Sequence, residues 1–114
     1  MKFSGRCVAD LQKSKYEIRY LPLFYDDLEE AVLYISDVLQ NETAAQKLID
    51  DTEAAISERA VSPVSFSPYP SAKKREHPYY RISVGNFSVF YVVIENVMEV
   101  RRFIYSKRDI DSIL

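Results

Sequence analysis

The sequence has few of the residues that build metal centres and disulfides. Its 114 residues include one cysteine, Cys7, and one histidine, His77. A single cysteine cannot form a disulfide within the chain, and with one histidine it cannot supply the four ligands of a Cys/His zinc site. We therefore expect no metal site and a reducing compartment.

Glycine is equally scarce, with only Gly5 and Gly85. Phosphate-cradling loops need several glycines close together so that backbone amides reach the phosphates, so nucleotide-driven chemistry and a bound cofactor are not expected. The longest uncharged apolar run, 82–94, is much shorter than the roughly 20 residues of a membrane helix. Residues 1–15 have no apolar segment typical of a secretory signal. The sequence predicts a soluble, cytoplasmic protein with no membrane partner.

The length and composition fit one domain with one core. Of the residues, 47% are hydrophobic and 28% are charged, which is typical of a globular chain. Residues 1–15 show no sustained periodicity and are predicted to be a loosely packed N-terminal extension. Residues 16–114 are predicted to form the single domain.

A strand and a helix are predicted first. Residues 16–21 alternate between aromatic or apolar and charged side chains, which predicts a half-buried strand that Pro22 ends. From Asp26, apolar residues recur at steps of three and four as far as Leu39. This spacing predicts an amphipathic helix that stops near Asn41.

A second helix is predicted to follow directly. Thr43 and Gln46 have the spacing of a capping box. The buried stripe of this helix is expected to be Ala45, Leu48, Ile49, Thr52, Ile56 and Ala60. Two helices joined by so short a turn are expected to form an antiparallel hairpin.

The second half of the chain reads as a loop and three strands. Residues 61–78 hold four prolines and four serines, which exclude regular structure over most of that length. Three β-branched and aromatic runs follow, 80–84, 87–94 and 97–105. The predicted class is α+β, in the order strand-helix-helix-strand-strand-strand, with a small antiparallel sheet packed on the helical hairpin.

The middle strand, 87–94, has two faces. Alternation places Phe87, Val89, Tyr91 and Val93 on one face and Ser88, Phe90 and Val92 on the other. One face is expected to pack on the helical hairpin, and the other is expected to be open or functional.

Charge is distributed unevenly. Residues 16–58 hold eleven acidic residues against Arg19 and Lys47, and residues 59–108 hold nine basic residues against three acidic ones. The net charge of −2 and the pI near 5.4 therefore combine an acidic helical half with a basic sheet half. Two interpretations stay open: the charges keep the domain soluble, or the sheet binds a polyanion. Aromatic residues that would stack bases in the second case are Tyr79, Tyr80, Phe90, Phe103 and Tyr105.

Three segments together carry a family resemblance. They are Tyr-Leu-Pro at 20–22 with Asp-Leu at 27–28, Tyr-Arg-Ile-Ser-Val-Gly-Asn-Phe at 80–87 with Phe-Tyr at 90–91, and Phe-Ile-Tyr-Ser-Lys-Arg-Asp at 103–109. In this order they resemble the RelE/ParE superfamily, the toxins of bacterial type II toxin-antitoxin (plasmid stabilisation) systems. The resemblance covers residues 16 to about 109 and implies the RelE/ParE-like fold.

The resemblance implies a toxin that a cognate antitoxin holds silent. Members inhibit growth either as mRNA interferases, cutting mRNA on the ribosome without a metal, or as inhibitors of DNA gyrase. Cleavage needs a group that takes the 2′-hydroxyl proton and cations that stabilise the charged transition state. The family positions imply catalytic roles for Arg81 and Arg108 as cations and for Tyr105 or His77 in proton transfer, with Lys107 in support.

The basic loop cluster has no family role of its own. Lys73, Lys74 and Arg75 lie in the proline-rich loop, where they either steer phosphates or keep the chain soluble.

Several positions depart from the nuclease pattern. Ser88 stands where many RelE-like nucleases carry arginine, Tyr105 stands where histidine is common, and the pI is acidic. Three functions stay open: a ribosome-dependent endoribonuclease, a gyrase inhibitor, and an inactive module that binds an antitoxin-like peptide. The target and the oligomeric state do not follow from the sequence.

Overall fold

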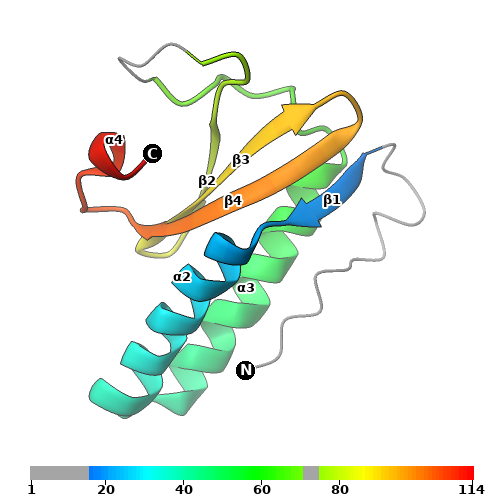
Figure 1. Cartoon of the computed structure of the whole chain (residues 1–114). Coiled ribbons are helices and arrows are strands. Elements are labelled where there is room, and N and C mark those ends of the chain that lie inside the picture. Colours follow the sequence, from blue (N-terminus) through cyan, green and yellow to red (C-terminus); the bar gives the residue numbers. More distant parts are fainter. Residues whose placement is uncertain (1–15, 71–74) are drawn as a thin grey trace.

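The computed structural model describes residues 16–70 and 75–114 (Figure 1). Within them the helices are α2 (Pro22–Leu33), the π-helical turn η1 (Tyr34–Val38), α3 (Glu42–Ala60) and α4 (Ile110–Ile113). The strands are β1 (Glu17–Tyr20), β2 (Tyr80–Val84), β3 (Phe87–Ile94) and β4 (Val97–Tyr105). The predicted α+β class and the order of elements are confirmed. The predicted extension, residues 1–15, lies outside the described residues.

The described strands form one sheet in the order β1-β4-β3-β2. The meander from β2 to β4 is antiparallel, as expected. Strand β1, however, pairs with β4 in parallel, from Glu17 opposite Val97 to Tyr20 opposite Val100. The sheet is therefore mixed, because the helical hairpin carries the chain from β1 at one edge to β2 at the other.

Both helices begin earlier than predicted. Helix α2 starts at Pro22, because proline at the first helical position lacks only an N–H that would have no intrahelical partner. The prediction that Thr43 caps the second helix is wrong. Asn41 caps α3 instead, and its side chain accepts a hydrogen bond from the Ala44 amide at 3.0 Å, since asparagine is at least as good a cap as threonine.

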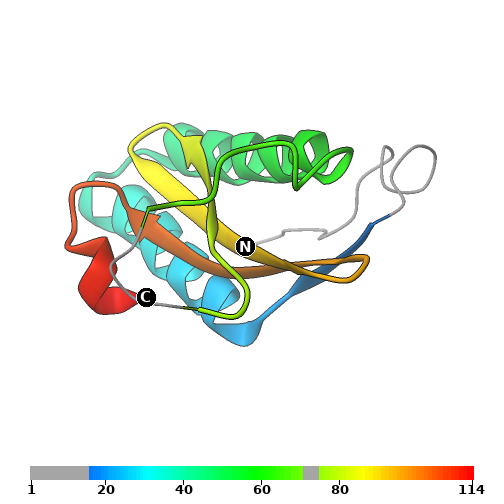
Figure 2. The same cartoon turned by 90° about the horizontal axis from the view of Figure 1, so that it is seen from above.

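The main core lies between the sheet and the two helices, which run side by side (Figures 1 and 2). Helix α2 contributes Phe24 and Leu28, both fully buried. The predicted stripe of α3 is buried, except for Leu48, which is half-buried. Strand β3 packs Val89 and Tyr91 on this side, as the alternation predicts.

The second face of the middle strand was expected to be open or functional, and it is not open. In Figure 1, α4 and the loop before β2 lie on the opposite side of the sheet from α2 and α3. Ser88, Phe90 and Val92 are all fully buried there. A second, smaller cluster contains Phe90, Ile104 and Ile110, packed against Tyr69, Tyr79, Ile113 and Leu114. The predicted loop thus covers part of this face.

The carboxylate of Asp27 joins α2 to the unpaired part of β4. Strand β1 pairs with β4 only as far as Val100. Beyond Val100, the Asp27 carboxylate accepts the backbone hydrogen bond from Phe103 that a neighbouring strand would otherwise accept. Its two oxygens accept hydrogen bonds from Arg102 Nε at 2.7 Å and Nη2 at 3.0 Å, and from the Phe103 amide at 3.0 Å. This bidentate pair raises the pKa of Arg102 through its hydrogen bonds to Asp27.

Replacing Asp27 by alanine is expected to lower the free energy of unfolding by about 2 kcal/mol, because a partly buried guanidinium and a strand amide lose their acceptor. Urea denaturation measures this as a lower midpoint with an unchanged slope. Asp51→Ala is the matched control, since it removes the exposed Lys47–Asp51 pair and should cost no more than about 0.5 kcal/mol. Equal losses in the two variants would contradict the anchoring role of Asp27.

Candidate functional site

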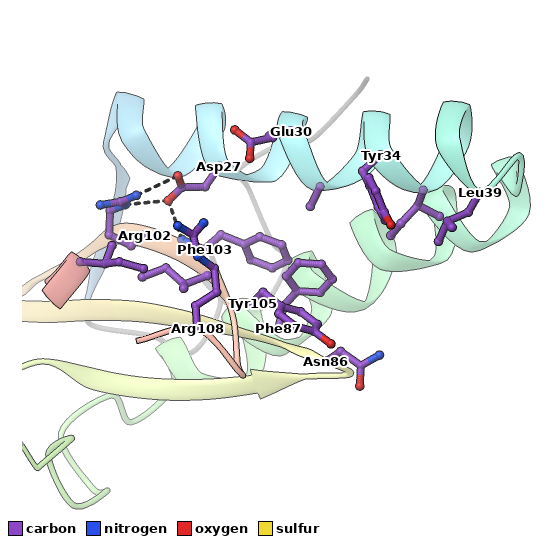
Figure 3. A pocket seen from close by; sticks show the side chains of 14 residues that line it. Asp27, Glu30, Tyr34, Leu39, Asn86, Phe87, Arg102, Phe103, Tyr105 and Arg108 are labelled. Atoms are coloured by element: carbon purple, nitrogen blue, oxygen red, sulfur yellow. Dashed lines mark hydrogen bonds and ion pairs between the residues drawn. The ribbon is translucent and has the colours of Figure 1, made fainter. Parts of the chain in front are cut away.

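A cavity of about 640 Å³ opens between the helical hairpin, the start of β3 and the end of β4 (Figure 3). We call it the α2–β4 groove; its lining includes Asp27, Glu30, Tyr34, Leu39, Asn86, Phe87, Arg102, Tyr105 and Arg108. Tyr34 is 54% exposed, Leu39 57% and Tyr105 39%. Large apolar side chains that gather on an accessible surface mark a binding site rather than a core.

The turn of the helical hairpin shapes one wall of the groove. The last turn of the first helix widens into the π-helical η1, a feature common at functional sites. The Leu39 amide donates to the Tyr34 carbonyl at 3.1 Å, and Gln40 has a left-handed φ of 51°. Figure 3 shows Tyr34 pointing from this wall toward Phe87 and Tyr105.

Two of the predicted site residues, Tyr105 and Arg108, lie in the groove. Tyr105 packs edge-on against Phe87, with ring centroids 5.6 Å apart. Arg108 is exposed, and no carboxylate in residues 16–70 or 75–114 pairs with it. The groove therefore combines apolar side chains with one cation, Arg108, and one acid, Glu30, neither of which has an ion-pair partner in the described residues.

Arg81 lies on the other face of the sheet. Its Nε donates to Ser88 Oγ at 2.8 Å, and Ser88 Oγ is 2.8 Å from Ser106 Oγ. The guanidinium lies 5.7 Å from the Tyr69 ring centroid and 5.9 Å from that of Phe90. The register of β2 places Arg81 opposite Phe90, and the hydrogen bond to Ser88 holds its Nε on this face.

The remaining predicted residues are dispersed. His77 is half-buried in the loop before β2, and Lys107 is exposed in the turn after β4; neither lines the groove. Arg75 stacks on Tyr79, with 4.9 Å between guanidinium carbon and ring centroid. Lys73 and Lys74 lie outside the described residues.

The described part of the chain contains no group of three or more His, Cys, Asp or Glu side chains that could hold a metal ion. No helix in the same part is long and apolar enough to cross a membrane.

A sequence model of the ParE toxin of type II toxin-antitoxin systems matches residues 18–110. The chain belongs to the ParE toxin family. The resemblance to RelE/ParE superfamily toxins is thereby confirmed, and this ParE-family protein is the toxin of a type II toxin-antitoxin system. No curated protein matches its sequence.

A solved structure shares the fold of this ParE-family toxin. A chain of the chromosomal ParDE system from P. aeruginosa has a TM-score of 0.68 and 14% identity; the match covers 82% of this chain and 98% of that one. A chain of the archaeal RelE-RelB complex from Pyrococcus horikoshii OT3 has a TM-score of 0.49, with the same identity and coverage. At such identities the ParDE match speaks for the fold alone.

Sequence reasoning missed part of the groove in this ParE-family toxin. Leu39 belongs to the predicted apolar stripe, but it is exposed and lines the groove. The signal that could have indicated this part of the groove is the length of the apolar stripe, which continues beyond Tyr34 as far as Leu39. The ion pair of Arg102 with Asp27 joins residues 75 positions apart and leaves no local pattern in the sequence.

The loop that carries Arg75, His77 and Tyr79 is anchored near its beginning. The buried Tyr91 hydroxyl donates to the Pro63 carbonyl at 2.7 Å. Arg59 Nη1 donates to that hydroxyl at 3.0 Å, and the Arg59 guanidinium lies 3.7 Å from the Phe66 ring centroid. Burial raises the pKa of the Tyr91 phenol above its ordinary value of 10.0.

Tyr91→Phe is expected to lower the free energy of unfolding of this ParE-family toxin by about 1 to 2 kcal/mol at neutral pH, because Pro63 loses a donor and Arg59 an acceptor. The raised pKa also makes the wild type lose stability as the pH rises above 10.0, where the unfolded phenol ionises first. Urea denaturation between neutral and alkaline pH should show a shallower alkaline decline for the variant. Identical declines would contradict this assignment.

Proposed function

We propose that this ParE-family toxin stops growth by inhibiting DNA gyrase, and that a cognate antitoxin holds it silent. The observation that carries the proposal is the separation of the four residues offered for RNA cleavage. Tyr105 and Arg108 line the α2–β4 groove, whereas Arg81 and His77 do not. Inhibition of a protein target needs a binding surface, and it does not need an assembled set of proton donors and acceptors.

The chemistry of RNA cleavage explains why this separation matters. A proton acceptor must reach the 2′-hydroxyl while cations contact the same phosphate. Arg81 is bound to Ser88 and stacked on Tyr69, on the sheet face away from the groove. Ser88, at the usual arginine position of the nucleases, is fully buried and has no access to a substrate.

A second candidate function is ribosome-dependent mRNA cleavage. The observation that favours it is the uncompensated charge of Arg81, Lys107 and Arg108, none of which pairs with a carboxylate in the described part of the chain. Cations without acidic partners are suited to phosphate contacts. The third candidate is the inactive module that binds an antitoxin-like peptide, and an experiment must distinguish it from the gyrase inhibitor and the nuclease.

The α2–β4 groove is the surface that we assign to the antitoxin. Tyr34, Leu39 and Tyr105 offer exposed apolar area, which a segment with apolar side chains would cover. Arg108 would pair with an acidic side chain of that segment. Asp27 and Arg102 neutralise each other at one wall, so they would leave the apolar contacts to determine affinity.

Induced expression of the toxin alone is expected to arrest bacterial growth, and co-expression of the adjoining reading frame should relieve the arrest. If gyrase is the target, broken DNA and a DNA-damage response accompany the arrest. Mapping of mRNA 5′ ends from the same cultures should show no new cuts within translated codons.

Two results would overturn the gyrase proposal. New cuts within translated codons, without DNA breaks, would identify the ribosomal nuclease. Normal growth with a folded, well-expressed product that copurifies with the neighbouring gene product would identify the inactive binding module.

Leu39→Asp is expected to weaken the complex with the neighbouring gene product at least about tenfold, because it places a charge on the apolar floor of the groove. Leu33→Asp is the matched control: Leu33, the last residue of α2, is 51% exposed and is not a lining residue of the groove. Isothermal titration of the two purified variants measures the difference. Equal weakening by both substitutions would move the antitoxin surface away from the groove.

A further inference from the structure

We infer that the sheet face turned away from the helices binds the phosphodiester backbone of DNA. The inference rests on the proposed function, in which the DNA is the segment held by gyrase. The residues that carry it form an arginine–aromatic cluster: Arg75, Arg81, Arg101, Tyr69, Tyr79 and Phe90.

Aromatic rings form the base of this cluster. Phe90 is fully buried, and Tyr69 and Tyr79 pack edge-on against it with centroids 5.3 Å and 6.3 Å away. Both tyrosines remain partly exposed. The faces of such rings attract guanidinium groups, so they can hold cations in place at the surface.

Each guanidinium of the cluster is held against a ring. Arg75 and Arg101 lie 4.9 Å and 5.8 Å from the Tyr79 centroid. Arg81 lies 5.7 Å from the Tyr69 centroid, and its Nε is bound to Ser88. These contacts orient the side chains in advance, so less conformational entropy is lost when an anion binds.

Most of this charge is not neutralised. Arg101 pairs with Glu99 at 2.7 Å, but neither Arg75 nor Arg81 has a carboxylate partner in the described ranges 16–70 and 75–114. Arg75 Nε and Nη2 are buried without an acceptor. Arg75 and Arg81 are therefore two oriented positive charges, held against Tyr79 and Tyr69, the two rings that pack on Phe90.

The distribution of charge favours a polyanion over a single small anion. Duplex DNA carries a negative charge every ~1.7 Å along its axis, so separated cations contact different phosphates at the same time. The acidic residues of 16–58 belong mainly to α2 and α3, on the other side of the sheet (Figure 1). DNA would thus be attracted by this face and repelled by the helical face.

The same acidic half predicts weak affinity for free DNA. A target enzyme that already holds DNA raises the local concentration and compensates for this weakness. The cluster would then orient the toxin on the complex of gyrase and DNA.

Fluorescence anisotropy of a labelled duplex oligonucleotide, titrated with the full chain at several salt concentrations, tests the inference. Binding should be detectable at low salt and should fall steeply as salt rises. Arg75→Ala and Arg81→Ala should each reduce the slope of log K against log salt by about one. Arg19→Ala, which removes one exposed charge from β1, is the matched control and should leave the slope unchanged; circular dichroism checks that each variant folds.

Several outcomes overturn the inference: no binding at low salt, equal effects of Arg19→Ala and Arg81→Ala, tighter binding of single-stranded RNA of the same sequence, or complete competition by polyglutamate. The two proposals fail separately. If the toxin inhibits gyrase but binds no DNA, the DNA site is contradicted and the proposed function stands. If the toxin binds DNA with the predicted variant pattern but has no effect on gyrase, the proposed function is contradicted and the DNA site stands.

Discussion

The rest of the structure depends on the hydrogen bonds that β4 makes on its β1 side. Strand β1 pairs with β4 in parallel up to Val100, and the Asp27 carboxylate then accepts the Arg102 guanidinium and the Phe103 amide. Because Asp27 lies in α2, this contact fixes the helical hairpin against the sheet. Both Asp27 and Arg102 also line the α2–β4 groove. One carboxylate thus links the fold to the surface assigned to the antitoxin.

The sheet separates two surfaces of different chemistry. On the helical side, the groove offers exposed apolar side chains, Tyr34, Leu39 and Tyr105, beside Arg108, which has no ion-pair partner in the described residues. On the other side, Arg75 and Arg81 are held against aromatic rings without acidic partners in the described residues. A protein ligand suits the first surface and a polyanion suits the second, so the chain has room for an antitoxin and for a target complex on different faces.

Local patterns predicted most of the fold, whereas contacts between distant residues were not predictable. The alternation in 16–21 and 87–94 and the apolar stripe of α3 reflect burial of one side of each element, which sequence periodicity records directly. The parallel pairing of β1 with β4 depends on the edge of the sheet to which the helical hairpin returns the chain. The helix cap is Asn41 and not Thr43, because the Asn41 side chain accepts the hydrogen bond from the Ala44 amide. Of the predicted site residues, Tyr105 and Arg108 line the same groove, whereas the strand register places Arg81 opposite Phe90, on the other side of the sheet.

The proposed action on gyrase is tested most directly by a supercoiling assay. Purified toxin is added to gyrase, ATP and relaxed plasmid, with and without the product of the adjoining reading frame. The toxin is expected to block supercoiling and to cause linear DNA to accumulate, and the antitoxin is expected to restore supercoiling. Full supercoiling at saturating toxin, from a preparation that arrests growth when expressed in cells, would contradict it.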